Sequence, residues 1–408
     1  MSEFLSLEAF EEASEKVKEV TLPTPLIYSE YFSGMAGNGN RVFLKPENMQ
    51  QTGAYKIRGA YYRISRLSDA ERKKGVITAS AGNHAQGVAY AASRYNCRAV
   101  IVMPTTTPLI KVNRTKALGA QVILYGDVYD EACEKAYELA DKEGYTFVHP
   151  FDDEGVATGQ GSIAMEIFKE QPLTDIILAP VGGGGLATGV SVLSKLLHPK
   201  CQVIGVEPEG AACLQASFKK NEVVTLPSVS TIADGTAVKR PGEKIFPYLQ
   251  KNIDRVITVD DADLVMAFLD MVENHKMVVE NSGLLTVAAL KKLKCKNKKI
   301  VCILSGGNMD VITMSSVVQQ GLIYRDRIFT VSVLLPDKPG ELQKVSGVIA
   351  AQNGNVIKLE HNQFITTNRS AQVELRITLE AFGSEHKEQI LAVLEKEGFM
   401  PKIVRTTL

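Results

Sequence analysis

The chain reads Asp-Ile-Ile-Leu-Ala-Pro-Val-Gly-Gly-Gly-Gly-Leu from Asp175 to Leu186. An apolar run, Ile176–Val181, ends in four glycines, and a segment with apolar residues at helical spacing, Leu186–Leu197, follows at once. A run with so few polar positions is typical of a strand that is buried on both faces of its sheet. A strand that leads through a short loop into a helix is the repeating unit of α/β folds with parallel sheets.

The same alternation extends over residues 41–320, so the glycine loop belongs to one of several strand–helix units. The apolar runs that predict strands are Arg41–Leu44, Gly75–Thr78, Ala99–Met103, Gln121–Leu124, Thr146–Val148, Ile176–Val181, Gln202–Val206 and Ile300–Leu304. The segments that predict helices include Gly53–Leu67, Asn83–Tyr95, Ile110–Leu118, Tyr129–Glu143 and Leu186–Leu197. We therefore expect an α/β domain over residues 1–320, with a smaller lobe at roughly 53–150.

The pattern changes near Arg325. Strands are predicted at Ile328–Leu335, Val356–Glu360, Ala371–Leu379 and Pro401–Arg405, and helices at Glu341–Gln352 and Ser384–Lys396. The order β-α-β-β-α-β is that of the ferredoxin-like unit. Residues 321–327 are expected to link the α/β domain to this second, α+β domain at 328–408.

Composition and charge exclude several classes of protein. The 408 residues carry 46 Lys and Arg against 46 Asp and Glu, so there is no basic surplus for nucleic acid or for an anionic membrane surface. No apolar run of about 18 residues is present that would predict a membrane-spanning helix. The cysteines include no C-x-x-C pair, and Met1–Val20 does not have the pattern of a signal peptide, so a cytoplasmic protein is expected.

The glycine run also predicts a ligand. Four consecutive glycines lose much chain entropy on ordering, and such a run is expected where the backbone must approach a ligand closely. Free N–H groups at the start of the following helix favour an anion, and the tetraglycine loop suits a single phosphate. The run also satisfies G-x-G-x-x-A through Gly182, Gly184 and Ala187, with Glu207 about 25 positions on. A nicotinamide-dependent dehydrogenase therefore stays open as an alternative.

Three more loops carry residues suited to a site. Ser80–His84 and Ser305–Asn308 each follow a predicted strand directly, and Lys56 lies in the first turn of a predicted helix after Thr52-Gly53. In open α/β sheets, ligands bind beyond the carboxyl ends of the strands. We therefore expect the four loops to form one site that contains a single lysine, Lys56.

Together these residues resemble a known family. The motifs Thr52-Gly53-x-x-Lys56-x-Arg58-Gly59-Ala60, Ser80-Ala81-Gly82-Asn83-His84-Ala85-Gln86-Gly87, the tetraglycine loop and Ser305–Asn308 are similar to those of the threonine/serine dehydratases, which include the threonine ammonia-lyases (threonine deaminases). The resemblance covers almost all of residues 1–320. It implies the two-lobed, tryptophan synthase β-like fold of type II pyridoxal-phosphate (PLP) enzymes. It also implies deamination of L-threonine to 2-oxobutanoate and ammonia, with L-serine to pyruvate as a second reaction.

The resemblance further implies a role for each site residue. Lys56 would hold PLP as a Schiff base and would act as the catalytic base. Asn83 would bond the ring hydroxyl, and Ser305 would face the pyridine nitrogen. The backbone groups expected to bind the phosphate are those of Gly182, Gly183, Gly184, Gly185 and Leu186. The residues expected to hold the substrate carboxylate are Ser80, Ala81, Gly82, Asn83 and His84.

Two positions depart from the family pattern. Ala54-Tyr55 stands where the family usually has Ser-Phe, which puts in doubt any role for a hydroxyl at position 54. Glu280-Asn281 stands where the family often has Glu-Pro.

Glu207 and the loop at 210–213 lie where some relatives bind a cation, but Cys213 replaces the second carboxylate. Whether a metal binds is therefore left unknown.

The tail around Leu335–Leu342 resembles an ACT domain, a small amino-acid-sensing module. The resemblance implies regulation by an amino acid, and isoleucine or valine is expected first because threonine deamination feeds isoleucine synthesis. Sheet edges in this domain invite pairing with a second copy, so a homo-oligomer (a dimer or a tetramer) is expected. The residues expected to line the effector site between two copies are Asp337, Gly340, Leu342, Asn353 and Asn355.

Two further alternatives stay open. A serine racemase or a serine-preferring dehydratase would share the same site, but racemases carry a serine at the position of Ala81 as a second acid/base. Ala81 has no proton to give, which favours dehydration. A catalytically inactive amino-acid sensor would be consistent with the tail alone, but the presence of Lys56 argues against it.

Overall fold

The computed structural model describes residues 3–362 and 373–406. The chain divides into two compact units, Met1–Met309 and Asp310–Leu408. The division falls just before helix α14 (Val311–Tyr324), so this helix belongs by its contacts to the second unit. Residues 321–327, expected to be a linker, include the end of α14 and the residues that lead into the next strand.

The larger lobe of the first unit is built on a six-stranded sheet with the order β1-β2-β10-β7-β8-β9. Its strands are β1 Ile27–Ser29, β2 Arg41–Lys45, β7 Ile176–Pro180, β8 Gln202–Pro208, β9 Arg255–Val259 and β10 Lys299–Ile303. All neighbours run parallel except β1, which pairs antiparallel with β2 at one edge. Strands β7 and β10 are buried almost throughout, as expected for a sheet covered by helices on both faces.

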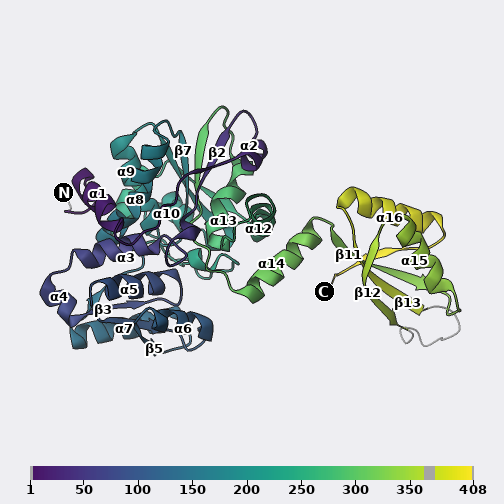
Figure 1. Ribbon diagram of the computed structural model, residues 1–408, viewed down its shortest axis with the longest axis horizontal. Helices are drawn as coiled ribbons and strands as arrows, with labels where there is room; N and C mark the ends of the chain where they lie inside the picture. Colours follow the sequence, from purple (N-terminus) through teal and green to yellow (C-terminus); the bar gives the residue numbers. More distant parts are fainter. Residues whose placement is uncertain (1–2, 363–372, 407–408) are drawn as a thin grey trace. The chain divides into compact units, whose positions relative to one another are not determined.

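The smaller lobe holds a four-stranded parallel sheet with the order β5-β4-β3-β6. Its strands are β3 Val76–Ala79, β4 Ala99–Met103, β5 Gln121–Leu124 and β6 Thr146–Phe147. Figure 1 shows α5, α6 and α7 around this sheet, and α8 and α9 in the larger lobe beside β7. The predicted α/β fold with two lobes and parallel sheets is confirmed.

The helices of the first unit connect these strands. They are α1 Leu7–Val17, α2 Glu30–Ala36, α3 Lys56–Ser65, α4 Asp69–Lys74, α5 Asn83–Arg94, α6 Leu109–Ala117, α7 Tyr129–Glu143, α8 Glu154–Glu170, α9 Gly185–Leu197, α10 Cys213–Lys220, α11 Phe246–Asn252, α12 Asp261–His275 and α13 Asn281–Ala288. Short 3-10 turns lie at η1 Glu47–Met49, η2 Glu209–Ala211, η3 Asp234–Thr236 and η4 Ala289–Lys292.

Helix α8 packs against α3 and α9 at very short range. A Cβ atom at Gly159 would lie 2.7 Å from the carbonyl oxygen of Arg58, and one at Gly189 would lie 2.0 Å from that of Ala157. Backbone therefore touches backbone at both contacts, which fixes α3, and with it Lys56, against the larger lobe.

The second unit continues from α14 in the order β11-α15-β12-β13-α16-β14. Its elements are β11 Ile328–Leu335, α15 Glu341–Ala351, β12 Asn355–Asn362, β13 Val373–Glu380, α16 Ser384–Lys396 and β14 Lys402–Val404. They form an antiparallel sheet with the order β12-β13-β11-β14. The predicted ferredoxin-like order is confirmed, although the start of the strand predicted at Ala371–Leu379 lies outside the described residues. In the described part of the chain, no helix has the length and apolar character needed to cross a membrane.

Candidate active site

Lys56 is the first residue of α3 and is partly exposed. Its Nζ donates a 2.6 Å hydrogen bond to the carbonyl oxygen of Pro150 and lies 5.3 Å from the centroid of the Tyr55 ring. Desolvation by the surrounding protein lowers the pKa of Lys56 to about 8, although the negative charge of Glu280 opposes this shift. An amine with such a pKa is neutral in a useful fraction of molecules near neutral pH, so it can act as a nucleophile or a base.

The loop before Lys56 is joined to the loop that follows β10. The N–H of Tyr55 donates to the carbonyl oxygen of Ser305 at 3.1 Å, and the N–H of Gly307 donates to that of Gly53 at 2.8 Å. Gly53 has a φ of +71°, and a Cβ atom there would lie 2.4 Å from Asn308 Oδ1. Both the backbone conformation and the close approach therefore require glycine at this position.

Asn83, the first residue of α5, connects the loop after β3 to the same group. Asn83 Nδ2 donates to Glu280 Oε1 at 2.7 Å, and Asn308 Nδ2 donates to Asn83 Oδ1 at 2.8 Å. Desolvation raises the pKa of Glu280 to about 7, and the hydrogen bond from Asn83 opposes this shift. Glu280 was not among the predicted site residues, because it follows no predicted strand and its contact with Asn83 joins segments far apart in the chain.

The backbone of Ser80–His84 has free donors at the start of α5. Within residues 3–362 and 373–406, the N–H groups of Ala81, Asn83 and His84 donate no hydrogen bond to the protein. Ser80, Ala81, Gly82 and Asn83 are also partly exposed. Donors that point away from the helix at its N-terminus suit a carboxylate.

The side chain of His84 is placed differently from the rest of its loop. It is 3% exposed, and its Nε2 is 2.9 Å from the carbonyl oxygen of Val148. Since a carbonyl can only accept, Nε2 carries the proton, and the buried Nδ1 has no partner among the described residues. Burial, together with the positive charge of Lys56, lowers the pKa of His84 to about 3. His84 is therefore neutral and supports the loop from within the protein.

The tetraglycine loop packs against Phe151, in the segment that also contacts Lys56. A Cβ atom at Gly183 would lie 2.2 Å from the ring of Phe151, and Phe151 follows Pro150, whose carbonyl oxygen binds Lys56 Nζ. In the described ranges, no hydrogen bond within the protein uses the N–H groups of Gly183, Gly184, Gly185 or Leu186. These donors lie at the N-terminus of α9, where the helix dipole adds to their attraction for an anion. They fit a phosphate group.

Ser305 supplies a neutral hydroxyl to the site. It is 4% exposed, and its Oγ makes no hydrogen bond with another described residue. The structure thus brings together the four predicted loops, with an amine, a set of free N–H groups for a phosphate, an amide donor and a hydroxyl. This set of groups fits PLP, whose aldehyde, phosphate, ring hydroxyl and ring nitrogen need such partners.

The region considered for a cation is engaged within the protein. Glu207 accepts hydrogen bonds from the N–H groups of Leu214 and Gln215 at 2.7 and 2.9 Å, and Cys213 Sγ is 3.8 Å from the carbonyl oxygen of Gly182. Among the described residues, no group of three or more His, Cys, Asp or Glu could hold a metal ion. Glu207 therefore caps the start of α10, and a metal stays unassigned.

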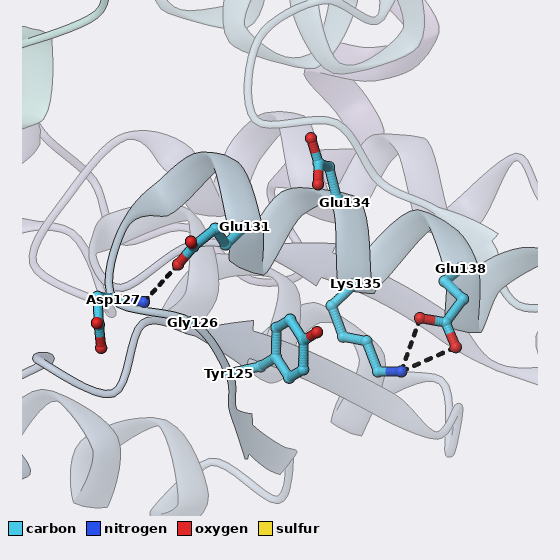
Figure 2. A pocket seen from close by; sticks show the side chains of 7 residues that line it. All are labelled: Tyr125, Gly126, Asp127, Glu131, Glu134, Lys135 and Glu138. Carbon is cyan, nitrogen blue, oxygen red and sulfur yellow. Dashed lines mark hydrogen bonds and ion pairs between the residues drawn. The ribbon is translucent and has the colours of Figure 1, made fainter.

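A surface pocket of about 500 Å³ lies in the smaller lobe, between the end of β5 and α7. Figure 2 shows its lining, in which Lys135 turns toward Glu138 and Glu131 reaches the N–H of Asp127. None of the candidate site residues lines this pocket. It is therefore separate from the four loops around Lys56.

The chain is similar to curated proteins over almost its whole length. An L-threonine ammonia-lyase of Thermotoga maritima is 40% identical over 401 residues, which are 98% of this chain and 100% of that protein. The biosynthetic L-threonine dehydratase IlvA of Escherichia coli is 36% identical over 94% of this chain and 74% of that protein.

Solved structures and a family model agree with these relatives. The processed form of threonine deaminase isoform 2 from Solanum lycopersicum has a TM-score of 0.73 and 40% identity, and the match covers 78% of this chain and 90% of that one. Maize serine racemase has a TM-score of 0.73 and 32% identity over 79% of this chain and 99% of that one. The family described as "Pyridoxal-phosphate dependent enzyme" matches residues 17–306. With its full-length relatives and its site around Lys56, the chain belongs to the family of pyridoxal-phosphate dependent enzymes.

Proposed function

We propose that the chain deaminates L-threonine to 2-oxobutanoate and ammonia, and L-serine to pyruvate and ammonia. The observation that carries this proposal is the position of Lys56, an amine with a lowered pKa where the four predicted site loops meet. Similarity over 98% of the chain to an L-threonine ammonia-lyase supports threonine as the substrate. The test is the release of 2-oxobutanoate from L-threonine by the purified protein supplied with PLP.

The chain's residues can be assigned to the parts of PLP. Lys56 would be joined to the aldehyde carbon, and the N–H groups from Gly182 to Leu186 would bind the phosphate. Asn83 would donate to the ring hydroxyl, and Ser305 would face the ring nitrogen. When bound, PLP supplies the electron sink that lets the Cα–H bond of the amino acid break.

The protein itself would orient the substrate and move the proton. The free N–H groups of Ala81, Asn83 and His84 would hold the carboxylate of threonine. Lys56 Nζ, released from PLP by the substrate amine, would remove the proton from Cα as the general base. Ser305 is a neutral hydroxyl and cannot keep the ring nitrogen protonated as a carboxylate would. This favours prompt loss of the β-hydroxyl over transamination.

Serine racemisation is the second candidate, because maize serine racemase has a similar structure. Racemisation needs a second acid/base on the face of Cα opposite Lys56. Ala81 occupies the position where racemases carry a serine, and its methyl group cannot transfer a proton. Formation of 2-oxobutanoate and pyruvate without D-serine would support deamination over racemisation.

The lowered pKa of Lys56 predicts how PLP joins the apoenzyme. Only the neutral amine attacks the aldehyde, and with a pKa of about 8 its fraction rises about tenfold from pH 7 to pH 9 and then levels off. We expect the rate constant for covalent attachment, followed by stopped-flow absorbance, to show the same plateau. An ordinary lysine would give a rate that still climbs at about pH 10, and that result would contradict the lowered pKa.

We also propose that the second unit is an ACT domain that binds an amino-acid effector in a homo-oligomer. The ferredoxin-like order of β11 to β14 supports this proposal. Gly340 has a φ of +92° at the start of α15, and a Cβ atom there would meet no other atom within 4 Å, so the backbone is open on that side. The side chains of Asp337, Leu342, Asn353 and Asn355 are exposed, and β12 is an edge strand open to pairing with another copy.

Removing the second unit should separate catalysis from regulation. A chain that ends after Arg325 is expected to deaminate threonine and to lose the response to isoleucine or valine. In the full chain this response should be a change of about fivefold or more in the concentration of threonine at half-maximal rate. The measurement is the initial rate against threonine, with and without each effector.

A second truncation makes this test sharper. Because α14 belongs to the second unit by its contacts, a chain that ends after Met309 removes the whole unit and leaves no unpartnered helix. Both truncated chains should behave alike. If either still responds fully to the effector, the regulatory site lies in the first unit and the proposal for the second unit is wrong.

A further inference from the structure

A chain of side-chain hydrogen bonds crosses three of the site loops. Asn308 Nδ2 donates to the carbonyl oxygen of Thr52 at 2.7 Å and to Asn83 Oδ1 at 2.8 Å. Asn83 Nδ2 in turn donates to Glu280 Oε1 at 2.7 Å. We call this series, from Thr52 through Asn308 and Asn83 to Glu280, the amide relay. It links the loop before Lys56 to the turn before α13.

The direction of the amide relay is fixed by chemistry at both ends. The backbone carbonyl of Thr52 can only accept, so Asn308 must turn its Nδ2 toward it. The second hydrogen of that nitrogen then points to Asn83, which must accept it with Oδ1. The Nδ2 of Asn83 is thereby turned toward the carboxyl group of Glu280, which accepts. One N–H of Asn83 is left over, and it is a donor.

The backbone around Glu280 is shaped for this contact. The N–H of Glu280 donates to the carbonyl oxygen of Gly306 at 2.9 Å, and the carbonyl of Glu280 accepts from Gly283 and Leu284 in the first turn of α13. A Cβ atom at Gly306 would lie 2.5 Å from Glu280 Oε1 and 3.1 Å from Asn83 Nδ2. The absence of a side chain at Gly306 is therefore what lets the carboxyl group and the amide meet.

Glu280 is not held by a basic side chain. Within residues 3–362 and 373–406, its carboxyl group makes no ion pair, and the side chain that donates to it is Asn83. Removing a carboxyl group from water without a salt bridge costs free energy of folding, so stabilising the fold does not explain why Glu280 is here. The position of Glu280, whose Oε1 accepts from Asn83 Nδ2, allows it to orient the Asn83 amide.

We propose that Glu280 and Asn308 are positioning residues that hold the amide of Asn83 with its remaining N–H toward the ring oxygen of PLP. This inference rests on the proposed function, in which Asn83 binds that oxygen. Without the relay the amide of Asn83 can rotate and present its oxygen instead. Two oxygens would then face each other, which would weaken the hold on PLP and disfavour the deprotonated ring oxygen.

The test uses the complete protein and two measurements other than activity. These are the visible absorption spectrum of the bound PLP and its dissociation constant from the apoenzyme. Glu280→Ala and Asn308→Ala should each weaken PLP binding by about tenfold and shift absorption toward the form with a protonated ring oxygen. Glu280→Gln should restore both properties to within about twofold of the original chain, because its amide oxygen can still accept from Asn83.

The double variant distinguishes a relay from two unrelated contacts. If both residues act through Asn83, Glu280→Ala combined with Asn308→Ala should weaken PLP binding by about the same tenfold as either change alone. Two independent effects would multiply to about a hundredfold. Asn281→Ala is the matched control, because Asn281 is the next residue and its amide bonds the carbonyl oxygen of Ile232 at 2.9 Å, outside the relay. It should leave the spectrum unchanged.

Two results would overturn the inference. One is an unchanged spectrum and dissociation constant in Glu280→Ala or in Asn308→Ala, and the other is a multiplied effect in the double variant. If Glu280→Ala does not fold, Asn308→Ala and Glu280→Gln still decide the matter, since Asn308 is partly exposed. Failure of the proposed function can be distinguished from failure of this inference. In that case the protein without substitutions would show no visible absorption band with PLP and would form no 2-oxobutanoate.

Discussion

Replacing Lys56 with alanine is expected to abolish the formation of 2-oxobutanoate, with a loss of at least about 10³-fold in kcat. The change removes both the amine that holds PLP and the base that takes the Cα proton. The fold should persist, because Lys56 Nζ donates to the carbonyl oxygen of Pro150 and makes no ion pair among the described residues. The measurement is 2-oxobutanoate release, with the unfolding midpoint measured alongside.

Two further variants show that the position of this amine matters. Lys56→Arg should be as inactive as the alanine variant, because a guanidinium stays protonated and cannot join PLP. Lys73→Ala is the control, since Lys73 is an exposed lysine in α4 and lies outside the site loops. It should keep the activity of the original chain. Turnover near that level in Lys56→Ala would refute the assignment of Lys56.

The strands of the first unit could be predicted because their sequences are continuous apolar runs. Strand β7 is buried along its whole length, and its sequence shows no polar interruption. Strands β1 and β9 were not predicted. β1 has three residues, and the burial of β9 is intermediate along most of its length, so neither produces a strong apolar signal.

Helix α8 shows why some elements have no clear sequence pattern. It is buried along most of its length, so polar and apolar faces do not alternate. Its close contacts are made by small residues such as Gly159 and Gly161, whose missing side chains let other backbones and rings approach. Helix α8 therefore lacks the helical spacing of apolar residues by which amphipathic helices are predicted.

Part of the candidate site could also be predicted from the sequence. The rule that ligands bind at the carboxyl ends of parallel strands selected loops that the structure brings together around Lys56. Glu280, Pro150 and Phe151 could not be found in this way. Their place in the site depends on contacts between segments far apart in the chain, such as Glu280 with Asn83 and Phe151 with Gly183.

Arg58 lies two residues after Lys56, at the centre of a buried cluster formed by Lys45, Glu47, Arg58 and Glu166. Its guanidinium donates to Glu47 at 2.7 and 2.8 Å and to Glu166 at 2.6 and 2.9 Å, and its side chain is fully buried. Lys45 Nζ lies 2.5 Å from Glu166 Oε2. Although burial works to raise it, the charges of Arg58 and Lys45 hold the pKa of Glu166 below its ordinary value. Glu166 therefore stays charged, and the two glutamates of the cluster face two basic side chains, Arg58 and Lys45.

We expect Arg58→Leu to destabilise the first unit by about 3–5 kcal/mol. Glu47 and Glu166 would then face Lys45 alone, which leaves one negative charge unpaired among buried groups. Arg58→Lys should recover only part of the loss, because an ammonium group cannot make the forked bonds that a guanidinium makes to two carboxylates. The measurement is the midpoint of urea unfolding, followed through the absorbance of bound PLP, which reports on the first unit.

Removing a second charge should partly reverse the effect. Arg58→Leu combined with Glu47→Leu leaves the pair of Lys45 and Glu166, so the cluster is neutral again. If the unpaired charge causes the loss, this double variant is expected to be more stable than Arg58→Leu, although it has fewer hydrogen bonds. Thr24 Oγ1, which donates to Glu47 Oε1 at 2.7 Å, loses its acceptor and limits the recovery. A double variant whose losses simply add would show that packing around Arg58, and not the balance of charge, stabilises the helix that carries Lys56.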